Sequence, residues 1–167
     1  IVIMNKVDDL LNTDHVKFLF SIFKINNADI RLVGGCIRDS LINRELKDID
    51  TATTLQPNKV INLLQNNNIE YDDFAIQYGS IISYPLKQKI QITTLREDIN
   101  QIGRHTNVIY TTDWKKDSAR RDFTFNALYL GGNNKLYDYY EGKTHLKESR
   151  IKFIGEIEDR IKEDYLR

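Results

Sequence analysis

Two aspartates lie one residue apart in the stretch "ELKDIDTATT", residues 45–54. The β-branched residues of this stretch predict a strand, and side chains two residues apart on a strand point to the same face. Asp48 and Asp50 would therefore repel each other, unless a divalent cation lies between them. Hard cations such as Mg²⁺ bind carboxylate oxygens and take phosphate oxygens as further ligands. Two solvated acids at a strand end are the alternative interpretation.

A second pattern, "LVGGCIRD", lies just upstream at residues 32–39. Gly34 and Gly35 follow a predicted strand and precede a predicted helix, so that backbone N–H groups and the positive helix end can approach a phosphate chain. Arg38 adds a guanidinium, which binds phosphate through two parallel hydrogen bonds. A plain tight turn and a surface ion pair between Arg38 and Asp39 are the alternatives. Together with the aspartates, this pattern predicts a phosphate site beside a metal site.

The composition narrows the classes of protein. The chain has 167 residues, enough for one domain with a real core. No apolar run approaches the roughly 20 residues of a membrane span, so we expect a soluble protein. Lys+Arg and Asp+Glu balance at 24 each, so any basic surface for a nucleic acid must be local. A single cysteine, Cys36, and the lack of a signal-peptide pattern at the start indicate a cytoplasmic location.

Helices and strands are expected to alternate along the chain. Besides the C-terminal segment, apolar spacing and turn residues predict helices over 13–24, 36–43, 56–67 and 116–130. Besides a short strand within 131–143, β-branched and alternating patterns predict strands over 29–35, 47–54, 79–85 and 88–96. The polar stretch 97–114 is expected to be a loop. This order predicts an α/β or α+β fold, in which a small mixed sheet is flanked by helices.

The segment "LVGGCIRDSLINRELKDIDTATTLQP" resembles the signature of the class II tRNA nucleotidyltransferases and bacterial poly(A) polymerases, in the polymerase-β-like nucleotidyltransferase superfamily. Three later segments agree in order and spacing. "SARRDFTFNALYL" is similar to the R-R-D-F-T-x-N-A motif, "DYYEGKTHLKESRIKFIG" to D-x-x-x-G…L…I-x-x-I-G, and "RIKEDYLR" to E-D-x-x-R. The resemblance extends from Ile30 to Arg167. It implies a nucleotidyltransferase head over 1–150 and the start of a truncated helical neck over 151–167.

The resemblance implies a role for each residue of the first two patterns. Asp48 and Asp50 would be catalytic and would hold two Mg²⁺ ions. One ion would activate the 3′-hydroxyl of the primer, and the other would bridge the triphosphate. Gly34, Gly35 and Arg38 would grip that triphosphate.

The double arginine would contact the incoming nucleotide. The resemblance implies that Arg121, with Arg120 and Asp122 beside it, binds the sugar and phosphates. Asn126 follows Asp122 by about one helical turn, so both are expected to face the same cleft. A solvated helix face is the alternative, above all for Arg120, because adjacent helical residues point in different directions.

Base selection is expected near the C-terminal end of the sequence. Asp164 and Arg167 lie three residues apart on a predicted helix and so share a face. A carboxylate acceptor beside a guanidinium donor can pair with cytosine or adenine, whose edges carry amino groups. The resemblance makes these two residues a protein template for CTP and ATP, positioned by Glu163. A surface acid–base pair is the alternative.

One position departs from the family pattern. Members often carry a third active-site carboxylate on the strand before the T-x-R segment, where this sequence has Gln91. This departure predicts weaker metal binding, unless Glu97 or Asp98 compensates.

Together, these features predict the catalytic head of a template-independent RNA nucleotidyltransferase. It would add CMP and AMP, from CTP and ATP, to the tRNA 3′ end. CC addition, A addition and poly(A) synthesis are alternatives, and so is a nucleotide-binding head that is inactive alone and serves as a subunit or remnant. The last predicted helix has no stop signal, and the family continues into neck, body and tail regions. We therefore expect these parts to come from a separate polypeptide or from the rest of a longer native protein.

Overall fold

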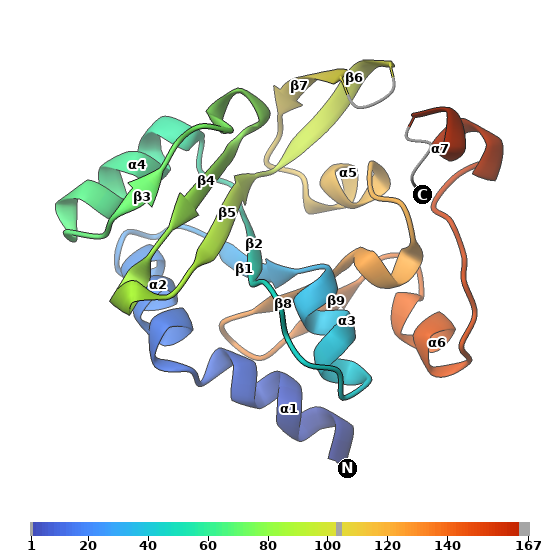
Figure 1. Ribbon diagram of the computed structural model, residues 1–167, viewed down its shortest axis with the longest axis horizontal. Helices are drawn as coiled ribbons and strands as arrows, with labels where there is room; N and C mark the ends of the chain where they lie inside the picture. Colours follow the sequence, from blue (N-terminus) through green and yellow to red (C-terminus); the bar gives the residue numbers. More distant parts are fainter. Residues whose placement is uncertain (1, 103–104, 164–167) are drawn as a thin grey trace.

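The computed structural model describes residues 2–102 and 105–163 (Figure 1). Its main sheet has the strand order β3-β4-β5-β2-β1-β8-β9. In that order, the strands span Tyr71–Asp72, Ser80–Ser83, Ile90–Thr94, Asp50–Thr53, Ile30–Val33, Leu128–Gly131 and Leu136–Asp138. β2 and β5 pair in parallel, whereas the other neighbours are antiparallel. The sheet is therefore mixed, as the sequence predicts.

One face of this sheet carries the main hydrophobic core. Helices α1 (Val2–Leu11), α2 (Asp14–Ile25), α3 (Gly35–Leu41) and α4 (Pro57–Asn66) contribute to it. Side chains such as Leu19, Ile37 and Leu64 pack there against Leu32 and Ile92 of the strands. Within the described part of the chain, none of the helices has the length and apolar character that a membrane span requires.

The opposite face carries a smaller aromatic cluster under α5 (Trp114–Ala119). Successive strand residues point to opposite faces, so Leu32 enters the main core while Val33 packs beside Trp114 and Tyr129. The rings of Trp114 and Tyr129 meet edge to face at 5.4 Å. This less covered face also receives the side chains of Asp50 and its neighbours.

The expected loop at 97–114 is wrong. Strands β6 (Arg96–Ile102) and β7 (His105–Tyr110) form an antiparallel hairpin, which projects beyond the main sheet in Figure 1. Among its described side chains, Ile99 and Ile109 are both exposed. None of the hairpin's described side chains, at 96–99 and 107–110, is fully buried, and the sequence lacks the alternation by which a half-buried strand is recognised.

The expected helix over 116–130 is also wrong beyond Ala119. After α5, the chain forms a short 3₁₀ turn, η3 (Thr124–Asn126), and then strand β8. The carboxylate of Asp122 accepts the N–H of Phe123 at 2.6 Å, and Phe123 is extended. Because β8 pairs with both β1 and β9, long-range strand pairing outweighs the helical spacing of the apolar residues.

The other predicted elements are present with shifted ends. Strand β2 begins at Asp50, so Asp48 lies in the segment before it rather than within the strand. Thr13 holds the N-cap position of α2, although its hydroxyl donates to the carbonyl of Leu10 instead of capping the helix. The remaining elements are the 3₁₀ turns η1 (Ile76–Tyr78) and η2 (Pro85–Lys87) and the helices α6 (Gly142–Lys147) and α7 (Ile157–Glu163).

The D-x-x-x-G spacing before α6 has a direct structural cause. The Asp138 carboxylate accepts the backbone N–H groups of Gly142 and Lys143 at 2.8 and 3.0 Å, so it caps the helix. Gly142 itself lies against the backbone of Thr124, where a Cβ atom would overlap the carbonyl oxygen. This close approach fixes α6 against the η3 turn.

We expect Gly142→Ala to destabilise the fold by about 1–3 kcal/mol, because the rigid backbone of Thr124 cannot yield as a side chain can. Denaturant unfolding followed by circular dichroism measures this change. Gly132→Ala is the matched control, since its new Cβ would meet only the ring of Phe20, at 3.2 Å, in an exposed turn. Equal stability of the two variants would contradict the packing argument.

Candidate active site

Three distant segments meet at one end of the sheet. β1 runs antiparallel to both β2 and β8, so the end of β1 lies beside the beginnings of its two neighbours. Gly34 follows β1, Asp50 is the first residue of β2, and Asn126 lies just before β8. The N–H of Gly34 donates to the carbonyl of Leu128 at 3.1 Å, which ties the turn to β8. The predicted residues are thus brought together by strand direction.

The glycine pair forms the turn between β1 and α3. Gly34 has a φ of +74°, a conformation that glycine adopts easily and other residues rarely adopt. A Cβ on Gly35 would lie 3.5 Å from Nη2 of Arg38, so this guanidinium lies over the turn. A phosphate bound at the turn would therefore meet both backbone and a positive charge.

Arg38 links the turn to the segment after the double arginine. Its Nη1 donates to Oδ1 of Asn126 at 2.9 Å, and Nδ2 of Asn126 donates to Oδ1 of Asp122 at 3.1 Å. Asp122 and Asn126 thus do face one another, through a 3₁₀ turn and not along a helix. Arg38 also pairs with Asp39 at 2.8 Å, so the ion pair considered as an alternative exists beside these contacts.

The two aspartates of the D-x-D pattern have different surroundings. Burial raises the pKa of Asp50 above its ordinary value, and the negative charge of Asp48 adds to this rise. The positive charges of Arg121 and Lys89 oppose it. Asp48 is exposed, and its carboxylate lies 3.6 Å from Nζ of Lys89. A half-buried acid beside an exposed one can hold a cation while remaining open to a ligand.

The fit of these acids to a metal ion depends on further ligands. Among the described residues, no three His, Cys, Asp or Glu side chains are grouped to hold a metal. Gln91 is the residue of β5 that pairs with Asp50, so it lies on the same face where a third acid would stand. Glu97 and Asp98 instead pair with Lys116 and Arg96. Two carboxylates therefore fit a hard cation whose remaining ligands are phosphate oxygens or water.

The sequence interpretation missed the residue that holds the double arginine. Asp117 is fully buried, and its Oδ2 accepts Nη2 of Arg121 at 3.2 Å while Oδ1 accepts two nitrogens of Arg120 at 3.3 Å. Both arginines therefore pair with one carboxylate, which speaks against the alternative of a solvated helix face. Although burial alone raises it, the charges of Arg121 and Arg120 bring the pKa of Asp117 below its ordinary value. The spacing of three and four residues is the signal that predicts such pairs.

A cavity of about 480 Å³ adjoins Arg38 and Asn126. Phe123 and Phe125 line it with stacked rings 5.3 Å apart, and Arg150 lies on its rim. Guanidinium groups bind phosphates and aromatic rings stack on bases, so these walls suit an anionic ligand that carries an aromatic ring.

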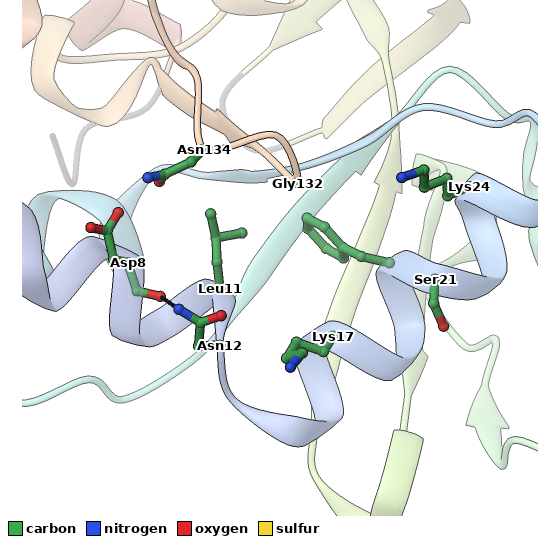
Figure 2. Close-up of a pocket in the computed structure, with 9 residues that line it drawn as sticks. Asp8, Leu11, Asn12, Lys17, Ser21, Lys24, Gly132 and Asn134 are labelled. Carbon is green, nitrogen blue, oxygen red and sulfur yellow. Dashed lines mark hydrogen bonds between the residues drawn. The ribbon is translucent and has the colours of Figure 1, made fainter.

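A second cavity, of about 460 Å³, lies between α1, α2 and the β8–β9 turn (Figure 2). Figure 2 shows Lys17 and Lys24 of α2 on one side and Gly132 and Asn134 on the other. Gly132 follows the end of β8, which pairs with the beginning of β1. This cavity is therefore at the opposite end of the sheet, and it contains none of the predicted site residues.

The predicted base-selecting residues are outside this geometry. Glu163 is the last residue of α7, and its side chain, with Asp164 and Arg167, lies outside the described residues.

Known proteins with similar sequences and structures are nucleotidyltransferases. CCA tRNA nucleotidyltransferase 1, mitochondrial, of Danio rerio is 38% identical over 158 residues, which are 94% of this chain and 37% of the relative. The crystal structure of Bacillus stearothermophilus CCA-adding enzyme in complex with CTP superimposes with a TM-score of 0.79 and 26% identity, over 91% of this chain and 36% of that one. The structure of a tRNA nucleotidyltransferase complexed with a primer tRNA and an incoming ATP analog gives a TM-score of 0.65 at 26% identity, over 81% and 38%.

Residues 30–152 match the family defined as the Poly A polymerase head domain, and the chain belongs to this family. The match includes the glycine turn, the two aspartates and the double arginine. The chain spans little more than a third of the length of these relatives.

We expect Asp50→Asn to stabilise the fold at neutral pH, raising the melting temperature by roughly 2–4 °C. Because the folded-state pKa of Asp50 is raised, its contribution is favourable below the unfolded-state pKa and is lost as the pH rises through the folded-state value. The gain should therefore vanish in acid. Thermal unfolding at both pH values measures it, and exposed Asp73→Asn is the control. A melting temperature for Asp50→Asn at or below that of the unaltered chain at neutral pH would refute this.

Proposed function

We propose that this chain is the catalytic head of a CCA-adding tRNA nucleotidyltransferase. It would bind CTP and ATP and add CMP and AMP to the 3′ end of tRNA, as the primer hydroxyl attacks the α-phosphate and pyrophosphate leaves. The observation that carries this proposal is the meeting of the glycine turn, Asp50 and Arg121 at one end of the sheet. The names of its relatives, a CCA tRNA nucleotidyltransferase and a CCA-adding enzyme in complex with CTP, support it.

The triphosphate is proposed to lie over the glycine turn. Gly34 and Gly35 allow close approach of the backbone, and Arg38 supplies a guanidinium that Asn126 holds at 2.9 Å. These groups would hold the nucleotide so that its α-phosphate lies beside Asp50. Such positioning is the main contribution of a protein to phosphoryl and nucleotidyl transfer.

The sugar and the phosphates nearer to it are proposed to contact the double arginine. Arg121 acts electrostatically on Asp50, so it lies beside the acid that faces the reacting phosphate. Arg120 lies on the other oxygen of Asp117, and Asp122 lies within the network of Asn126 and Arg38. Opposite charges on the two sides of the α-phosphate would orient it for attack.

A pair of Mg²⁺ ions is proposed at Asp48 and Asp50. When bound, such ions lower the pKa of an attacking hydroxyl and neutralise a triphosphate. Asp50 suits this role because its burial makes an unpaired negative charge unfavourable, so that a cation relieves it. Gln91 offers a neutral amide beside it, so the protein supplies fewer charges than a three-acid site would.

Selection of CTP and ATP is proposed for Asp164 and Arg167, positioned by Glu163. In the same proposal, residues 1–150 form the head and 151–167 begin a helical neck. A separate polypeptide, or the rest of a longer native protein, supplies the remaining helical part, and the protein acts in the cytoplasm. The length of the relatives supports a further part, because they are about two and a half times as long as this chain.

We expect Mg²⁺-dependent binding of CTP that disappears in the double variant Asp48→Ala, Asp50→Ala. The reason is that the triphosphate and the cation bind as a unit, and removal of both carboxylates leaves the cation without protein ligands. Calorimetry with and without Mg²⁺ measures this. Exposed Asp72→Ala, on the edge strand β3, should bind as the unaltered chain does. Unchanged Mg²⁺-dependent binding in the double variant would remove the metal assignment.

Addition of nucleotides is tested with labelled CTP or ATP and a tRNA that ends before its CCA. We expect little addition by the isolated chain, because it carries no net charge to hold tRNA by its phosphates. Addition should return when a separate helical part of a relative is supplied. The number and order of added nucleotides distinguish CCA, CC, A and poly(A) synthesis. Failure to add any nucleotide in that mixture would count against the proposed function.

A further inference from the structure

The carboxylate of Asp117 lies under the double arginine and accepts hydrogen bonds from several parts of the chain. Asp117 has no exposed surface. Besides Arg120 and Arg121, its oxygens accept the hydroxyl of Tyr129 at 2.6 Å and the backbone N–H of Arg96 at 3.1 Å. Donors therefore come from the loop after α5, from β8 and from the first residue of β6.

These contacts fix the direction of the Arg121 guanidinium. Its Nη2 donates to Asp117 and its Nε donates to the hydroxyl of Tyr129, both at 3.2 Å. The Tyr129 hydroxyl in turn donates to Asp117, so the three groups form a closed ring of hydrogen bonds. Within the described part of the chain, Nη1 of Arg121 has no hydrogen-bond partner. The ring thus occupies one edge of the guanidinium and leaves the other edge free for a ligand.

The guanidinium lies within electrostatic reach of the predicted reaction centre. Arg121 is the positive charge that acts most strongly on Asp50. A guanidinium on a long side chain has many rotamers, and buried partners that lock one of them remove the entropic cost of ordering it when a ligand binds. Removal of such supporting groups reduces the affinity of a site although the ligand never touches them.

We propose that Asp117 is the positioning residue for Arg121, which it holds through the Tyr129 hydroxyl ring so that the free edge of the guanidinium binds the phosphates of the incoming nucleotide. This inference rests on the proposed function for the identity of the ligand, whereas the hydrogen-bond geometry is independent of that function. Asp117 does not touch the nucleotide. Because it also accepts the N–H of Arg96, the same carboxylate joins the base of the β6–β7 hairpin to the nucleotide site.

A double-mutant cycle with Asp117→Asn and Arg121→Ala tests this, with CTP affinity in Mg²⁺ as the readout. We expect each single variant to lose affinity on the order of tenfold, as supporting residues typically do. The double variant should lose no more CTP affinity than the single variant that binds CTP less tightly, because both substitutions remove the same phosphate contact. Losses that multiply, or unaltered CTP affinity in a folded Asp117→Asn protein, would overturn the proposal.

Two further variants complete the design. Tyr129→Phe keeps the three charges and removes only the bridging hydroxyl, so it serves if Asp117→Asn does not fold. Tyr129→Phe alone should weaken CTP binding. Added to Arg121→Ala, it should cause no further loss of CTP affinity. Asp72→Asn is the matched control, because Asp72 also accepts a tyrosine hydroxyl, that of Tyr84 at 2.7 Å, but on an exposed edge. It should bind CTP normally, and a loss as large as that of Asp117→Asn would overturn the proposal.

A second readout does not depend on nucleotide binding. In ¹⁵N-labelled protein, the Nε–H signal of Arg121, identified by its loss in Arg121→Ala, should exchange slowly with water. We expect fast exchange of this proton in Asp117→Asn, while the folded spectrum is retained. Failure of the unaltered chain to bind CTP would refute the proposed function, whereas an unchanged Nε–H signal in Asp117→Asn would refute the positioning role by itself.

Discussion

The direction of β1 relative to its two neighbours is the constraint on which the site depends. An antiparallel strand ends where its partners begin, so one short strand gathers residues from around positions 34, 50 and 126. The register matters as much as the direction. A slip of one residue between β1 and β2 would turn Asp50 toward the helices of the main core and bring Thr51 to the open face. Burial of the Asp50 carboxylate among the apolar side chains of the main core would be costly, and this cost opposes such a slip.

Two aspartates at this end of the sheet show how environment divides one residue type into two roles. Asp117 is surrounded by donors, so its pKa is lowered and its charge is stable without solvent. Asp50 is also shielded from water, yet its pKa is raised because its neighbours compensate less of the desolvation. The charge of the Asp117 carboxylate is compensated within the protein, so this residue suits a structural role. The Asp50 carboxylate is left short of positive charge, which is the condition that favours binding of a cation.

The sequence predicts the parts of the fold whose patterns are local. The β1 strand, the glycine turn, α3 and α4 follow from alternation, from the special conformation of Gly34 and from Pro57 at the first turn of its helix. The family motifs also predict which residues meet, because Arg38, Asp122 and Asn126 do form one network.

The errors arise where distant contacts decide the structure. The β8 strand has a helical apolar spacing and becomes a strand only because β1 and β9 flank it. The β6–β7 hairpin buries no continuous face and therefore has no periodic pattern. Asp117 has the right spacing to pair with both arginines, but its complete burial depends on Trp114, Tyr129 and the start of β6, which only the folded chain brings together.

The position of Cys36 makes the site indifferent to oxidants. The thiol lies in α3 directly behind the first residue of β2, and its Sγ contacts the carbonyl oxygens of Val33 and Asp50 at 3.4 and 3.7 Å. It is 2% exposed, and burial raises its pKa to about 11, so almost none of it is thiolate at neutral pH. Thiolate is the form that peroxides and disulfides attack. Cys36, the single cysteine of the chain, therefore packs behind Asp50 as a small apolar side chain would. Redox changes in its surroundings leave this packing unchanged.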